Sequence, residues 1–107
     1  MKLNRYTSVA HATRGLHQRG YKDEFKLEGP HKMKNLETGG VYSPSEMTIV
    51  EYHRFEGMSN PSDMSIVFAV ESEDGRKGTI VSTYGAYANM KLVEFMDKVK
   101  IKESATA

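Results

Sequence analysis

Seven consecutive residues, EYHRFEG from Glu51 to Gly57, bring two carboxylates, an imidazole and a guanidinium together around two aromatic rings. Alternate residues of an extended strand share a face, so we expect Glu51 and His53 on one face and Arg54 and Glu56 on the other. A carboxylate beside an imidazole can share a proton or a metal ion. A guanidinium binds carboxylates and phosphates through its planar fork of N–H donors.

The Arg54 side of this stretch has two interpretations. In the structural one, Arg54 and Glu56 organise the loop that follows, with Asp63 as a partner. In the functional one, Arg54 is the centre of a small-anion site, helped by the N-terminus of a helix that begins after Tyr84 and Tyr87. The candidate ligand-binding residues are Arg54, Glu56, His53, Tyr84 and Tyr87.

Several kinds of chemistry are excluded by composition. The chain has no cysteine, so disulfides, thiolate metal sites and cysteine nucleophiles are absent. Its four histidines form no HxH or HExxH spacing, and the sequence has no nucleophile elbow or other catalytic motif. We therefore predict no metal and no cofactor, and we lean toward a protein without catalytic activity.

Charge is unevenly distributed along the chain. Residues 1–34 contain eight bases and three acids, a net charge of +5, and the remainder carries −4 because the whole chain is at +1. We favour a basic face closing on an acidic face of one domain over an anionic partner. Nucleic-acid binding is the weaker alternative, because few aromatic residues accompany the N-terminal bases and no known module is present. The bases in question are Arg5, Arg14, Arg19 and Lys22.

The 107 residues fit one small domain, which we place at 1–100, followed by a short, polar, disordered tail at 101–107. The first residues contain no apolar signal region. The longest apolar run, Ile66 to Val70, is far short of the ~20 residues that span a bilayer. We expect a cytoplasmic protein with no membrane partner.

Two helices are predicted from capping residues and spacing. Thr7 or Ser8 caps the first helix, which stops at Gly20. Asn89 caps the second, whose apolar residues recur at helical spacing. The apolar residues of the second helix are Leu92, Val93, Phe95, Met96 and Val99.

Strands are predicted where apolar and polar residues alternate. Asp23 interrupts the first of them, and in the second the alternation puts Ile49 and Phe55 on the face of Glu51. A stretch rich in glycine, residues 29–40, is predicted to be a loop, and SPSE from Ser43 to form a single turn. The predicted strands are 21–28, 47–55, 64–72 and 76–84.

Asp74 and Gly75 stand between two β-branched runs and predict a hairpin, because both tolerate a positive φ. A two-residue turn would pair Glu73 with Arg76 and Phe68 with Val81. A three-residue loop with a bulge would instead place Glu71 opposite Lys77. The sequence leaves both registers open.

Short connections between strands favour an antiparallel meander. We therefore expect an α+β fold, a two-layer sandwich with a mainly antiparallel sheet of about four strands. Both helices, the N-terminal and the C-terminal one, are expected on one face.

Four motifs resemble a family of short, uncharacterised bacterial proteins. They are RGY followed by Phe25, RFEG at 54–57, DGRKG at 74–78 and YGAYA at 84–88. Members of that family are sometimes labelled automatically as phosphoribosylpyrophosphate synthetases. The chain has no GxxxxGK[ST] loop and no acidic ribose-phosphate loop, so the resemblance implies a grouping without an activity.

We expect a small non-catalytic binding or interaction module. One alternative is a small-anion or sugar-phosphate binding protein, or a small enzyme, using Arg54 and Glu56. Another is a weak nucleic-acid binder through the basic N-terminal segment. Self-association as a homodimer is a further hypothesis, because neither face of residues 47–56 is cleanly apolar.

Overall fold

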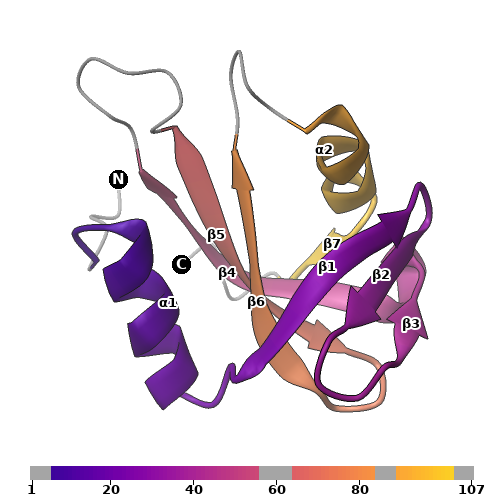
Figure 1. Ribbon diagram of the computed structural model, residues 1–107, viewed down its shortest axis with the longest axis horizontal. Coiled ribbons are helices and arrows are strands. Elements are labelled where there is room, and N and C mark those ends of the chain that lie inside the picture. Colours follow the sequence, from indigo (N-terminus) through magenta and orange to yellow (C-terminus); the bar gives the residue numbers. More distant parts are fainter. Residues whose placement is uncertain (1–5, 56–63, 84–88, 103–107) are drawn as a thin grey trace.

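The computed structural model describes residues 6–55, 64–83 and 89–102 (Figure 1). Its strands form one seven-stranded sheet in the order β3-β2-β1-β6-β5-β4-β7, curved into a half-barrel. The β1–β6 and β4–β7 pairs are parallel and the others are antiparallel. In chain order the elements are α1 (Val9–Gln18), β1 (Asp23–Gly29), β2 (Lys32–Asn35), β3 (Val41–Tyr42), the 3-10 turn η1 (Pro44–Glu46), β4 (Met47–Phe55), β5 (Ser65–Ser72), β6 (Lys77–Thr83), α2 (Met90–Asp97) and β7 (Lys100–Ile101).

The predicted sandwich of about four antiparallel strands is wrong. The sheet has seven strands because three short strands extend it: β2, β3 and β7. Its direction is mixed because the β1–β6 and β4–β7 pairs are parallel. The strand β2 lies within residues 29–40, which were expected to be a loop, and pairs antiparallel with β1. Four residues rich in lysine carry little hydrophobic periodicity, so only the pairing with β1 reveals them as a strand.

The prediction that both helices cover one face is also wrong. Successive side chains of β5 point to opposite faces. On one face, α1 packs Ala12 and Leu16 against Val67 and Ala69 of β5. On the other, Phe95 of α2 joins the larger core cluster inside the curve of the sheet.

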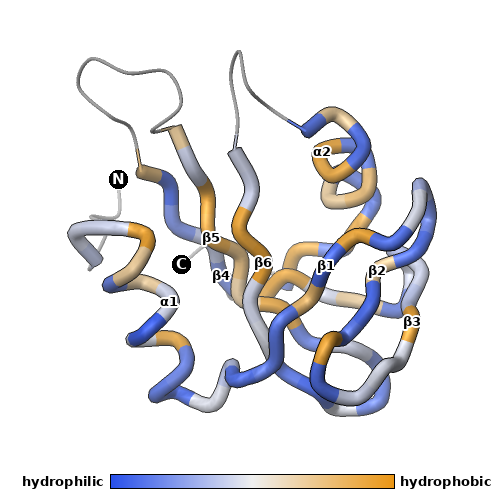
Figure 2. The backbone as a smooth tube through the Cα atoms, in the orientation of Figure 1, coloured by the Kyte–Doolittle hydropathy of each residue, from blue (hydrophilic) through white to orange (hydrophobic). Residues whose placement is uncertain are grey.

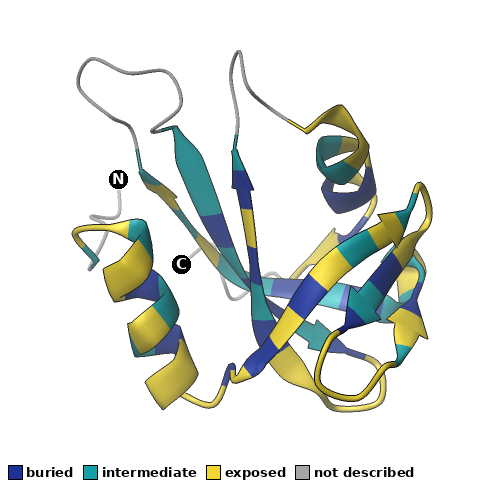
Figure 3. Cartoon of the chain, in the orientation of Figure 1, coloured by how far each residue is buried: buried dark blue, intermediate teal, exposed yellow. Residues whose placement is uncertain are grey.

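Both faces of the central strands are therefore buried. Inside the curve, Ile49, Val70 and Ile80 pack with Phe95 and Met96. Hydrophobic residues concentrate in β5 and α2, whereas most of α1 is hydrophilic (Figure 2). The outer side of α1 is exposed, and buried residues recur along the strands (Figure 3).

Local signals in the sequence placed most element ends correctly. The Ser8 hydroxyl accepts from the backbone N–H of His11 at 3.1 Å, and Asn89 caps α2 in the same way. The predicted SPSE turn is η1, closed by a capping box between Ser43 and Glu46. These features depend on neighbours within four residues, so the sequence determines them.

A β-bulge in β4 changes which side chains share a face. The register against β5 shifts between Ile49 and Glu51, so Val50 is an extra residue on this strand. Ile49 lies in the inner core, whereas Val50 and Phe55 pack beside the cluster under α1. The predicted grouping of Ile49 with Glu51 is therefore wrong, because an alternation rule cannot count across a bulge.

The Asp74–Gly75 hairpin uses the longer of the two predicted turns. Glu71 pairs with Lys77, and the Ser72 N–H donates to the Arg76 carbonyl at 2.9 Å. Gly75 has φ +91°, the left-handed conformation that this three-residue loop requires.

At the other end of the sheet, β7 adds a short parallel strand to β4. Ile101, assigned by the sequence to the tail, pairs with Ile49, and the Lys102 N–H donates to the Ile49 carbonyl at 2.8 Å. The predicted disorder of the tail from 103 onward falls outside the described residues.

Candidate functional site

The curved sheet separates two of the predicted site residues. His53 is paired with Val67, on the α1 face, whereas Arg54 is paired with Ile66, on the face inside the curve. The other three candidates, Glu56, Tyr84 and Tyr87, lie outside the described residues. A site that uses both His53 and Arg54 would therefore have to reach around the sheet.

On the α1 face, Glu51 is the centre of a polar network. Arg19 donates to both of its oxygens, at 3.0 and 2.5 Å, and His53 Nε2 lies 2.7 Å from Oε2. The hydrogen bond from Arg19 is the main cause that lowers the pKa of Glu51 from 4.5 to about 2, and the contact with His53 acts in the same direction. The carboxylate is thus held ionised and fully used by partners in the chain.

Tyr6, which precedes α1 in the chain, completes this network. Its hydroxyl accepts from Arg19 at 3.2 Å, and its ring meets His53 edge-on with the centroids 4.8 Å apart. The same ring covers Gly15, where a Cβ would come within 2.5 Å of it. Glycine inside α1, which costs helix stability, is explained by this close packing.

Inside the curve, Arg54 lines a cavity of about 400 Å³ between the sheet and α2. Its apolar walls come from both layers, and its charged lining residues are Arg54 on β4 and Asp97 at the end of α2. The apolar lining residues are Ile49, Tyr52, Ile66, Phe68, Val93, Met96, Val99 and Ile101.

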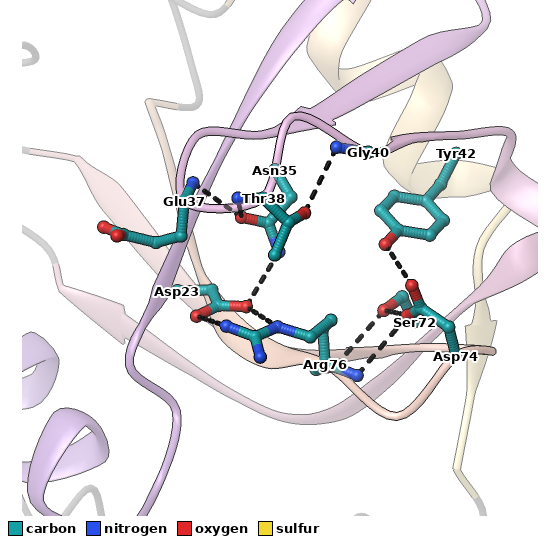
Figure 4. Close-up of polar contacts among 9 residues, drawn as sticks. All are labelled: Asp23, Asn35, Glu37, Thr38, Gly40, Tyr42, Ser72, Asp74 and Arg76. Atoms are coloured by element: carbon teal, nitrogen blue, oxygen red, sulfur yellow. Dashed lines mark hydrogen bonds and ion pairs between the residues drawn. The ribbon is translucent and has the colours of Figure 1, made fainter.

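A second polar cluster, which sequence reasoning missed, joins three strands and a hairpin turn (Figure 4). Arg76 donates to both oxygens of Asp23, at 2.6 and 2.8 Å, and the Asn35 amide donates to Asp23 at 2.7 Å. The Arg76 hydrogen bond is the main reason that the pKa of Asp23 is lowered. Asp23 had appeared only as a break in the apolar alternation of β1, and a buried carboxylate at such a break needs a cation nearby.

The same cluster closes two turns. The Asn35 side-chain oxygen accepts from the backbone N–H groups of Glu37 and Thr38 at 2.8 and 3.2 Å. In the hairpin, Asp74 accepts from the Tyr42 hydroxyl at 2.6 Å and from the Ser72 hydroxyl. No buried side-chain polar atom in the described part of the chain lacks a hydrogen-bond partner, so the contacts of this cluster are explained by its role in fixing the half-barrel.

Comparison with family models, with curated proteins and with solved structures found no match. The role of each cluster is therefore inferred from its geometry alone. Within residues 6–55, 64–83 and 89–102, no three His, Asp or Glu side chains gather as metal ligands. In the same part of the chain, no helix is long and apolar enough to cross a membrane.

Both faces of β4 now have partners in the same chain. Arg19 and Tyr6, on either side of α1, contact Glu51 and His53, and Tyr52 and Arg54 line the inner cavity. The mixed pattern of this strand thus needs no second copy to explain it, and the homodimer stays a prediction. Of the basic N-terminal residues named as a candidate nucleic-acid site, Arg19 is bonded to Glu51.

Proposed function

We propose that the protein is a non-catalytic binding module for a small ligand with an apolar body and one anionic group. The ligand occupies the cavity between β4–β6 and α2, and Arg54 receives the anion. The observation that carries this proposal is the composition of the cavity: apolar walls from both layers with a guanidinium on its lining. Binding sites of small molecules combine mainly apolar walls with a few polar groups that orient the ligand.

The size of the cavity supports a small ligand. Its volume of about 400 Å³ is at the lower end of the ~300–1,000 Å³ that small-molecule sites have. Phe68 and Tyr52, whose rings lie 6.4 Å apart, offer an aromatic floor. A flat or short-chain apolar body fits this floor better than a polar sugar does.

The polar groups of the lining favour binding over catalysis. Ser82 lines the cavity, and its hydroxyl donates to the backbone carbonyl of Thr83 at 3.4 Å. The ionisable side chains of the cavity lining are Arg54, Asp97 and Tyr52. A serine nucleophile needs a base within hydrogen-bond reach. The planar fork of N–H donors on a guanidinium matches carboxylates and phosphates, so Arg54 serves as an anion receptor.

The test is a thermal-shift series with defined probes. Octanoate and phenyl phosphate should raise the melting temperature, because ligands that bind only the native state stabilise it. Inorganic phosphate, which lacks the apolar body, should not. Arg54→Gln should abolish the shift by both anions, whereas Lys91→Gln, a cation of α2 outside the cavity lining, should leave it intact.

Changing the charge of the cavity lining and the charge of the probe tests the role of Arg54 further. Asp97→Asn removes the acidic side chain from the lining, so it should strengthen the binding of phenyl phosphate. Benzylamine should bind less well than the anions, and Asp97→Asn should weaken it further. Equal binding of phenyl phosphate by the native chain and Arg54→Gln would refute the proposed role of Arg54.

A further inference from the structure

The parallel pairing of β1 with β6 ends after two residue pairs. Asp23 pairs with Gly78 and Glu24 with Thr79, and then β1 turns toward β2 and β3 (Figure 1). On its other side β6 stays paired with β5 as far as Thr83. Among the described residues, nothing pairs with the β1-side edge of β6 beyond Thr79.

This edge carries hydrogen-bonding capacity. Every second residue of a strand directs its N–H and C=O to one edge, and an unpaired edge is a template for another strand. Most sheet edges are covered or very short, as at β3 and β7, which have two residues each. The stretch from Ile80 to Thr83 instead opens in the middle of the sheet, between two diverging strands.

A groove of about 760 Å³ runs beside this edge on the outer face. Its floor includes Val81, which is 46% exposed, and Leu36, which is 49% exposed, stands on the far side. The wall toward α1 is formed by Ala10, Thr13, Arg14 and His17. A groove with apolar floor positions along an unpaired strand edge has the form of a site for an extended peptide.

The charges along the groove indicate which peptide it prefers. Arg14 on α1 and Lys26 on β1, two residues beyond the last β1–β6 pair, line the groove, and neither forms an ion pair within the described part of the chain. The acids on the lining lie at or near the end where β1 and β6 pair. Asp23 and Glu24 form the two β1–β6 pairs, and Arg76 neutralises Asp23. Glu37 lies close by, because the N–H of the preceding residue, Leu36, donates to the Glu24 carbonyl.

We propose that the outer edge of β6 from Ile80 to Thr83 binds an extended peptide of a partner protein, which adds to the sheet as a strand. Its acidic side chains face the groove, toward Arg14 and Lys26, and its alternate side chains, which point to the face inside the curve, are apolar. The groove lies on the opposite face of the sheet from the small-ligand cavity, whose lining includes Ser82 of the same edge. The inference does not use Arg54, so it can hold where the proposed function fails.

Titration with blocked peptides, followed by amide NMR, tests the inference. Acetyl-EVEVE-amide at millimolar concentration should shift the Ile80–Thr83 amides and slow their hydrogen exchange. Acetyl-KVKVK-amide should bind at least tenfold more weakly, and acetyl-EVPVE-amide, which loses a backbone donor, should bind weakly as well. No perturbation of β6 by the acidic peptide at 10 mM would overturn the proposal.

Two variants locate the contact. Val81→Glu places a like charge on an exposed position of the floor and should reduce the affinity for acetyl-EVEVE-amide at least tenfold. The double variant Arg14→Gln/Lys26→Gln should reduce it and remove its salt dependence, whereas Lys32→Gln, an exposed lysine outside the groove lining, should not. Unchanged affinity in both groove variants would place the peptide elsewhere.

Discussion

Two carboxylates of this protein, Asp23 and Glu51, are each held by an arginine that donates to both oxygens, yet their surroundings differ. The Asp23 side chain is 6% exposed and shares its second contact with Asn35, which is fully buried. The Glu51 side chain is 18% exposed and shares its second contact with His53. The same ion-pair geometry is therefore found in a buried junction of strands and in a network at the edge of α1.

The difference lies in what is left when the pair is broken. Without Asp23, a buried amide loses its acceptor and cannot reach water, and an unmade buried hydrogen bond is costly. Without Glu51, Arg19, which is 38% exposed, can be solvated instead. Partly exposed pairs contribute little for that reason. The free energy of unfolding should therefore respond more strongly to the Asp23 junction.

The largest effect should come from the backbone beneath that junction. A Cβ on Gly78 would overlap the Asp23 carbonyl oxygen and approach Phe25 to 2.7 Å, where β1 and β6 make their two pairs. Gly78→Ala should lower the free energy of unfolding by about 3 kcal/mol, as overpacking does, measured by urea denaturation. Gly29→Ala, with open space around its Cβ, is the control and should change it little.

Next in size is removal of the carboxylate itself. Asp23→Ala should cost about 2 kcal/mol, because Asn35 and its turn lose the acceptor that positions them. The neighbouring exposed acid provides the control: Glu24→Ala should stay within about 0.5 kcal/mol. Equal losses for the two variants in urea denaturation would contradict a special role of the junction.

A smaller loss is expected on the α1 side. Glu51→Gln should cost about 1 kcal/mol, the upper range for an ion pair that is partly exposed. If it destabilised the protein as much as Asp23→Ala, burial would not be what separates the two networks.

The pH dependence distinguishes the two carboxylates further. Folding lowers the pKa of Glu51 from 4.5 to about 2, so the stability it contributes is complete above about pH 4.5 and is lost as the pH falls toward 2. Thermal melts of Glu51→Gln across this range should show a shallower decline than the native chain. The decline that remains is expected from the other carboxylates whose pKa values are lowered, Asp23 among them.

The smallest effect is expected at the pair across the β5–β6 hairpin. Lys77 Nζ lies 3.8 Å from Glu71, and the Lys77 side chain is 47% exposed. Lys77→Gln should change the free energy of unfolding by about 0.5 kcal/mol or less. A loss above 1 kcal/mol in urea denaturation would mean that its position over the Tyr21 ring matters more than the ion pair does.

Sequence reasoning succeeded where the cause lies within a few residues. Ser8 and Asn89 cap their helices, β4 has the predicted bounds, and the Asp74–Gly75 hairpin forms with one of its two predicted registers. The candidate ligand-binding residues stay a prediction. Arg54 lines the inner cavity and His53 points to the other face, as the alternation of a strand requires.

The sequence by itself determined the helix caps, the long strands, the turn residues and the absence of cysteine chemistry. The tertiary structure alone decided the seven-stranded order, the placement of the helices on opposite faces, the bulge in β4 and the pairing of Asp23 with Arg76, 53 residues away. The physical reason is range. Caps and turns are satisfied by neighbouring backbone groups, whereas strand order and buried charge pairs depend on segments that meet only when the sheet curves and closes on its core.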